Sequence, residues 1–139
     1  MPLDAFLTPV LALIVLSLLV WIWMYATRIP AIQRAGIDPQ NARHPGSLDG
    51  LPSPVRQVAD NYNHLMEQPT IFYALSFYIV LADHSNAFNI YLAWTYVGLR
   101  VLHTLIQCTV NNVTLRFSVF ALSTLALMAM AAREVFALV

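Results

Sequence analysis

Charged residues are scarce in this chain. They make up 10% of its 139 residues, whereas hydrophobic residues make up 59%. A soluble globular domain carries about 25% charged residues. A chain of this length cannot hide so much apolar surface from water, so a water-soluble domain is excluded and a single-domain membrane protein is predicted over residues 1–139.

Cysteine and lysine are also rare or absent. Cys108 stands alone, which excludes an intrachain disulfide and a cysteine metal cluster. All seven basic residues are arginine, and they balance seven acidic residues, so the net charge gives no sign of a nucleic-acid partner and none is expected. His44 and His84 lie singly in predicted loops, and no metal site is expected.

Long apolar runs are what the chain has in abundance. Phe6 to Ala26 is a run of 21 uncharged residues, and a membrane-spanning helix needs about 20. Asp4 precedes this run and aromatic residues close it, which is typical of a retained helix and not of a cleaved signal peptide. With three further runs, the sequence predicts four helices at about 6–28, 58–83, 88–111 and 115–137, and a long loop at about 29–57.

The arginines are distributed unevenly among the predicted connections. Arg28, Arg34, Arg43 and Arg56 lie in or beside the first loop, the second link "DHSN" has none, and the third ends at Arg116. Because arginine is enriched on the cytoplasmic side, loops one and three are predicted to be cytoplasmic and both termini to be outside. The expected location is the bacterial cytoplasmic membrane.

Polar side chains form a stripe on each of two predicted helices. On the third helix the spacings are four, three, four and four, at Tyr96, Arg100, His103, Gln107 and Asn111. On the second, a similar spacing joins Arg56, Asp60, Asn63 or His64, and Glu67. Since a charge in lipid is costly and the tight link makes these helices neighbours, we predict a Glu67–Arg100 ion pair inside the membrane. The polar layer either joins helices or contacts a ligand, and the sequence leaves both open.

These segments resemble a known family. "NHLMEQPTIFYAL", "RVLHTLIQCTVNNVTLRF" and the start "TPVLALIVLSLLVWIWMYATRIPA" are similar to the MAPEG family, the membrane-associated proteins of eicosanoid and glutathione metabolism, and in particular to its bacterial branch. The resemblance implies a bundle of four transmembrane helices assembled as a homotrimer. It also implies glutathione bound between subunits near the cytoplasmic face.

The resemblance also implies site residues. The family's thiolate-stabilising arginine matches Arg116, sixteen residues after Arg100, and is the expected catalytic residue. The expected glutathione-binding residues are Arg28, Arg56, Asn63, His64, Glu67, Arg100, His103 and Gln107. Three positions depart from the family's glutathione enzymes: His64 stands where they have asparagine, and Gln107 and Phe120 stand where they have tyrosine.

Two functions remain open. The chain is either a glutathione-dependent transferase or peroxidase that acts on lipophilic substrates from the bilayer, or a non-catalytic membrane trimer that binds a lipid or joins a larger membrane complex. The altered positions leave the choice between an enzyme and a structural protein undecided.

Overall fold

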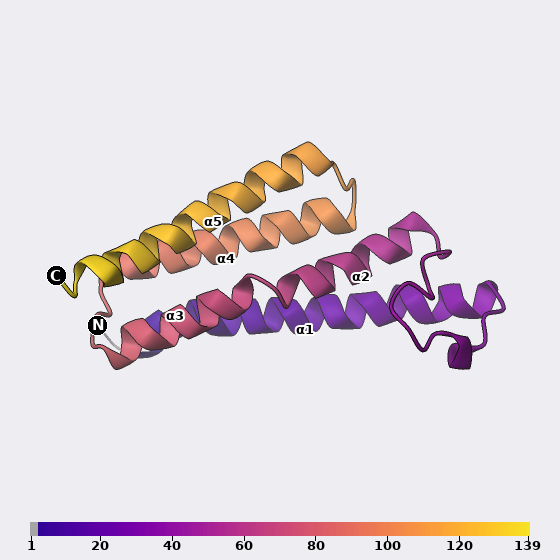
Figure 1. The fold of residues 1–139 in the computed structure, drawn as a ribbon, viewed down its shortest axis with the longest axis horizontal. Helices are drawn as coiled ribbons and strands as arrows, with labels where there is room; N and C mark the ends of the chain where they lie inside the picture. The colour runs from indigo at the N-terminus through magenta and orange to yellow at the C-terminus, as the bar shows by residue number, and fades with distance from the viewer. Residues whose placement is uncertain (1–2) are drawn as a thin grey trace.

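The protein is entirely α-helical. The computed structural model describes residues 3–139, with the elements α1 (Leu3–Arg34), the short 3₁₀ helix η1 (Pro39–Asn41), α2 (Ser53–Leu65), α3 (Pro69–Leu81), α4 (Ala87–Cys108) and α5 (Val113–Phe136). α2 and α3 follow one another in a single leg, so the chain runs along the long axis of the bundle four times (Figure 1). The all-α, four-helix fold predicted from the sequence is confirmed.

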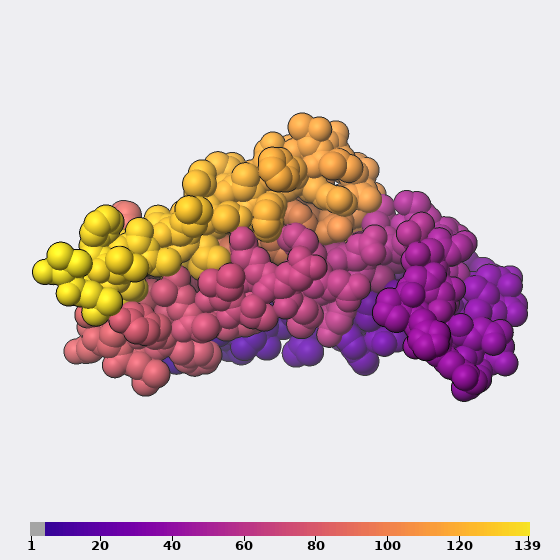
Figure 2. All heavy atoms as spheres, in the orientation of Figure 1, coloured from indigo at the N-terminus to yellow at the C-terminus, as the bar shows by residue number. Residues whose placement is uncertain are grey.

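The connections lie alternately at the two ends of the bundle. Both termini and the α3–α4 link lie at one end, and the long α1–α2 loop and the α4–α5 turn lie at the other (Figure 1). At the first end the Glu134 carboxylate of α5 is 2.5 Å from His84 Nδ1 in the α3–α4 link, and it accepts a hydrogen bond from Asn89 Nδ2 at 3.3 Å. At the other end the loop forms a separate lobe beside the helices (Figure 2).

α1 runs beyond the end that the sequence predicted. Pro30 lies inside it without ending it, and the helix continues to Arg34. It stops at Gly36, whose φ of +65° lies in the left-handed region, where glycine has no steric penalty. The amide of Ile37 donates to the Ile32 carbonyl and that of Gly36 to the Gln33 carbonyl, which is the pattern of a Schellman motif. The loop therefore covers 35–52, shorter than the predicted 29–57, because α2 also begins early, at Ser53.

The second leg is broken where the sequence predicted one helix over 58–83. α2 ends at Leu65 and α3 begins at Pro69, with a turn at Met66–Gln68 between them. Pro69 has no N–H to donate to the preceding turn and is tolerated in the first turn of a helix, so it ends one helix and starts the next. Both Glu67 and Gln68 lie in this turn, and the break decides where their side chains point.

The surface of the bundle is strongly apolar. Phe6, Leu13, Phe72 and Ile79 form part of a fully buried core, yet Leu18 is 59% exposed and Phe117 is 64% exposed. Two of the described helices are long and apolar enough to cross a membrane by length and composition alone, Ala5–Arg34 and Val113–Phe136. The 22 residues of α4 would span a membrane by length, although α4 carries buried polar side chains such as Arg100 and Gln107.

The topology makes a direct prediction about accessibility. Ser47 in the exposed loop and Ser85 in the α3–α4 link lie at opposite ends of the bundle (Figure 1). In a Cys108→Ser background, we expect an impermeant thiol reagent added outside intact cells to label Ser85→Cys but not Ser47→Cys. Labelling of both residues from outside, or of Ser47→Cys alone, would contradict the orientation inferred from the arginines.

Candidate functional site

The polar stripe of α4 faces the inside of the bundle. Tyr96, Arg100, His103 and Gln107 are all buried, and Arg100 and Tyr96 have no exposed surface at all. Four-three-four spacing brings these side chains to one side of a helix, and in the fold that side packs against α2 and α5. The interpretation of this stripe as an inner face is confirmed for these four residues. Asn111, the fifth residue of the predicted stripe, lies in the turn after α4 and is only half-buried, because the helix ends at Cys108.

The inner face of α2 differs by one residue from the predicted stripe. Arg56, Asp60, Asn63 and Glu67 are exposed, and the residues that bond across the bundle are Gln57, Asn61, His64 and Gln68. Asn61 Nδ2 donates to Thr104 Oγ1 at 3.1 Å, and Gln57 Nε2 donates to the Thr109 carbonyl at 3.0 Å. The signal was present in the sequence, because these four neutral side chains repeat at the same four-three-four spacing.

Gln68 joins three helices at the break between α2 and α3. Its Nε2 donates to Thr124 Oγ1 of α5 at 2.9 Å, and its Oε1 accepts from the Tyr96 hydroxyl of α4 at 3.3 Å. Both ends of the amide are therefore satisfied inside the bundle, where an unpaired polar group is costly. Sequence reasoning did not single out Gln57, Asn61, Gln68 or Thr104.

The predicted Glu67–Arg100 ion pair is wrong for the described chain. Arg100 is fully buried, and its Nη2 donates to His64 Nδ1 at 2.7 Å. Glu67 is exposed on the turn before Pro69, and no ion pair joins it to Arg100 in residues 3–139. The physical reason is the one-residue shift of the inner face, which places His64 toward α4 and turns Glu67 outward. Arg100 Nε and Nη1 make no hydrogen bond with any of the residues that the structure describes.

An aromatic cluster surrounds the Arg100–His64 contact. The rings of His64 and His103 are stacked, with centroids 4.8 Å apart and planes 11° apart. Phe120 of α5 meets the His64 ring edge to face at 5.2 Å, and the Arg100 guanidinium carbon is 5.9 Å from the Phe120 ring centre. Since imidazole and guanidinium planes pack well on aromatic rings, this cluster fixes the orientation of both histidines.

A cavity of about 240 Å³ opens beside this cluster, and we call it the α5 pocket. Its lining comes from α2, α4 and the first turns of α5: His64, His103, Gln107, Val113, Arg116, Phe117 and Phe120. His103 Nδ1 and Gln107 Oε1 are sealed from solvent and have no hydrogen-bond partner within residues 3–139. Arg116 donates to Asn111 Oδ1, which positions the guanidinium at the N-terminus of α5. A positive charge at a helix N-terminus in this cavity favours an anionic ligand group.

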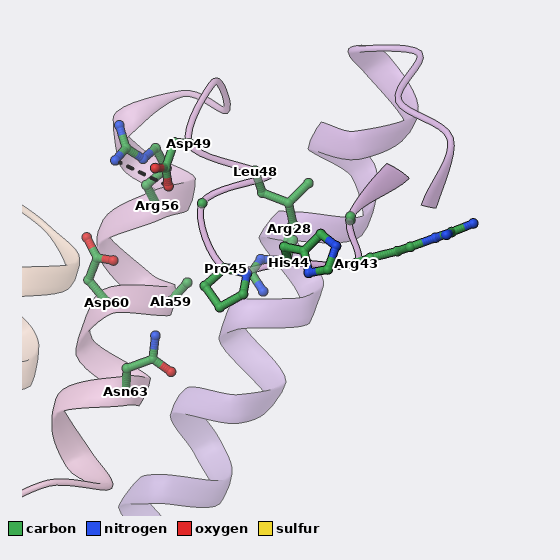
Figure 3. Close-up of a pocket in the computed structure, with 12 residues that line it drawn as sticks. Arg28, Arg43, His44, Pro45, Leu48, Asp49, Arg56, Ala59, Asp60 and Asn63 are labelled. Atoms are coloured by element: carbon green, nitrogen blue, oxygen red, sulfur yellow. Dashed lines mark ion pairs between the residues drawn. The ribbon is translucent and has the colours of Figure 1, made fainter. Parts of the chain in front are cut away.

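A second cavity of about 420 Å³ lies between α1, α2 and the long loop, and we call it the loop pocket (Figure 3). Arg28 from α1 and Asp60 and Asn63 from α2 line it, and His44, Pro45 and Leu48 of the loop cover it. Arg56 lies at its rim, where Nη2 is 3.8 Å from Asp49 Oδ1. Arg28 Nε is buried and has no hydrogen-bond partner in the described part of the chain.

The predicted site residues therefore divide between two pockets. Arg28, Arg56 and Asn63 line the loop pocket, whereas His64, His103, Gln107 and Arg116 line the α5 pocket. Asn63 and His64 are neighbours in sequence, but consecutive residues of a helix point about 100° apart, so α2 separates the two groups. Arg100 lies behind His64, and Glu67 lines neither of these two pockets.

Fold and site together define an all-α membrane bundle with two polar pockets toward the end that carries the long loop. The model of the MAPEG family matches residues 6–136, and the chain belongs to this family. It is therefore an integral, multi-pass membrane protein. No curated protein and no solved structure matches the chain.

Proposed function

We propose that the protein binds glutathione between neighbouring copies of a homotrimer and joins its sulfur to a lipophilic substrate, or uses glutathione to reduce one. The observation that carries this proposal is the division of the polar residues. Each chain has one cavity lined by Arg28 and Arg56 and another lined by Arg116, and α2 keeps them apart. A ligand between two copies reaches the loop pocket of one copy and the α5 pocket of the next.

The loop pocket suits the peptide part of glutathione. The tripeptide carries two carboxylates and one ammonium group. Arg28 and Arg56 are cations at the wall of the pocket, and Asp60 is an anion beside them. Arginine binds a carboxylate with two parallel hydrogen bonds, so these two guanidinium groups suit the two carboxylates of the tripeptide.

The α5 pocket suits the thiol. A positive charge beside a thiol favours the thiolate and lowers its pKa, and a helix N-terminus acts in the same direction. Arg116 supplies the charge in the first turn of α5. Ligand pockets measure about 300–1,000 Å³. At about 240 Å³ the α5 pocket accommodates only part of a tripeptide, which supports a binding site shared with the loop pocket of a neighbour.

The lipophilic substrate enters from the bilayer. Phe117 lines the α5 pocket and is also 64% exposed on the outer side of α5, and Val113 is 63% exposed. An apolar entrance beside a polar, cationic interior is what a reaction between a membrane-dissolved electrophile and a water-soluble thiol requires. In the proposed orientation the arginine-rich end faces the cytoplasm of a bacterial cell, where glutathione is supplied.

Glutathione titration of the detergent-purified protein tests this proposal. We expect calorimetric binding in the millimolar range and a rise in near-ultraviolet absorbance as the bound thiol ionises. S-methylglutathione, which has no ionisable thiol, should bind without the rise. If glutathione gives neither signal, the enzyme hypothesis fails and the non-catalytic trimer remains. The loss of two tyrosine hydroxyls at Gln107 and Phe120 favours that second candidate.

A further inference from the structure

The position of the proton on the His64 ring follows from one contact. Arg100 Nη2 lies 2.7 Å from His64 Nδ1, and a guanidinium nitrogen can only donate. Nδ1 must therefore accept, which a doubly protonated ring cannot do. The ring is neutral in this arrangement and carries its proton on Nε2.

The Nε2–H of His64 is free to act on a ligand. Among residues 3–139 it makes no hydrogen bond, and it is not sealed from solvent. The ring to which it belongs lines the α5 pocket. The Arg100 contact on one nitrogen and the stacking on His103 hold the ring in one orientation, so this donor is fixed before a ligand arrives.

His64 lies deeper in the bundle than the cation of the pocket. It contacts Phe120, which is four residues or about 6 Å along α5 from Arg116. Along α4 it lies beside His103, one turn deeper than Gln107. If the thiolate lies at Arg116, the His64 donor lies deeper in the bundle than the thiolate. The donor is then next to the Phe117 and Phe120 rings that the apolar substrate contacts.

We propose that His64 donates its Nε2–H to the carbonyl oxygen of an α,β-unsaturated aldehyde or ketone, and so directs the enzyme to this class of electrophile. This inference rests on the proposed function of the same site. Glutathione loses its thiol proton to solvent, and the thiolate sulfur forms a bond to the β-carbon. The C=C electron pair moves toward the carbonyl, whose π pair moves onto oxygen, giving an enolate.

The enolate oxygen gains charge as the C–S bond forms, and a donor held in place stabilises that charge without having to reorient. Water then returns a proton to the α-carbon, and the product is a thioether with its carbonyl restored. His64 keeps its proton throughout. Its role is that of a neutral imidazole polarising a carbonyl, a role in which a neutral ring is an adequate donor.

A pair of substrates tests this role. A long-chain 2-alkenal puts negative charge on oxygen when a thiolate attacks, whereas a benzyl chloride of similar size releases chloride and has no oxygen. Removal of one such donor costs about 100-fold in rate or more. We expect His64→Phe to lower the ratio of kcat/KM for the alkenal to kcat/KM for the chloride by about 100-fold. His64→Gln, which can still accept from Arg100 and donate an N–H, should restore part of the ratio.

Both rates come from one preparation, so a loss of folded protein cancels in the ratio. An unchanged ratio, or complete loss of both reactions, would overturn the role of His64. Nitrogen-15 NMR of the imidazole rings gives a second reading, with His64 assigned by its absence in His64→Gln. We expect the Nε2–H tautomer, and an Nδ1–H or doubly protonated ring would also overturn the proposal. Absence of glutathione binding in the wild type would instead overturn the proposed function.

Discussion

Arg116→Ala is expected to abolish the thiolate absorbance that glutathione produces with the wild-type protein. An opposite charge close to an acidic group lowers its pKa by about 1–3 units, so loss of the guanidinium should reduce the ionised fraction of bound thiol about 10-fold or more. Arg116→Lys should retain part of the signal, because the charge remains while the planar fork is lost. The measurement is near-ultraviolet difference absorbance during a glutathione titration.

Arg34→Ala is the matched control. Arg34 lies at the same end of the bundle, is exposed, and lines neither the loop pocket nor the α5 pocket. It removes the same charge from the same side of the membrane and should leave the absorbance unchanged. If the two variants lose the signal equally, the effect belongs to the general field of the basic end, and Arg116 has no specific role. A full signal in Arg116→Ala would remove it from the chemistry.

The second large effect concerns the partner of Arg100. In a double-mutant cycle with Arg100→Leu and His64→Leu, we expect a coupling free energy of about 1.5–3 kcal/mol, the range for a hydrogen bond to a charged group. The same cycle with Glu67→Leu should give a clearly smaller coupling, because Glu67 is exposed and forms no ion pair with Arg100 in the described chain. Unfolding of the detergent-solubilised protein by heat or denaturant measures both.

Position 64 also allows a conservative control. His64→Gln keeps an acceptor for the Arg100 guanidinium, so the cycle with His64→Gln should give a smaller coupling free energy than the cycle with His64→Leu. A larger coupling with Glu67 than with His64 would restore the ion pair that the sequence predicted. It would mean that the carboxylate reaches Arg100 in the assembled protein.

The fold was accessible from the sequence because the apolar runs and the α4 stripe are long and regular. The end of α1 was predicted too early, because Pro30 does not end the helix and Gly36, in a left-handed conformation, does. Pro69 indicated an irregularity in the second leg. A proline can bend a helix or divide it into two, and the packing decides which of these occurs.

The site was predicted less well than the fold. The α2 stripe was drawn through its charged residues, although charges cost more to bury than amides do, and the amide stripe one residue away was the inner one. Arg100 is buried nevertheless, and its partner is a neutral histidine. The spacing of residues along a helix does not indicate which residue pairs with a buried arginine. The separation of the two pockets depends on how α1, α2 and α5 pack together, which a single sequence does not specify.

Substitutions in the two polar stripes of α2 should differ in their effect on normal copies made in the same cell. Gln57, Asn61, His64 and Gln68 bond within their own chain, whereas Arg56, Asp60, Asn63 and Glu67 face outward. In the proposed homotrimer, the outer-stripe residues of the loop pocket border the site that one copy shares with the next, a head-to-tail contact that closes into a ring. When normal and altered copies are expressed together, a variant of Gln57, Asn61 or Gln68 should harm only the copy that carries it and behave as recessive. A variant of Arg56 or Asn63 should also impair the site shared with a normal neighbour, and so behave as dominant.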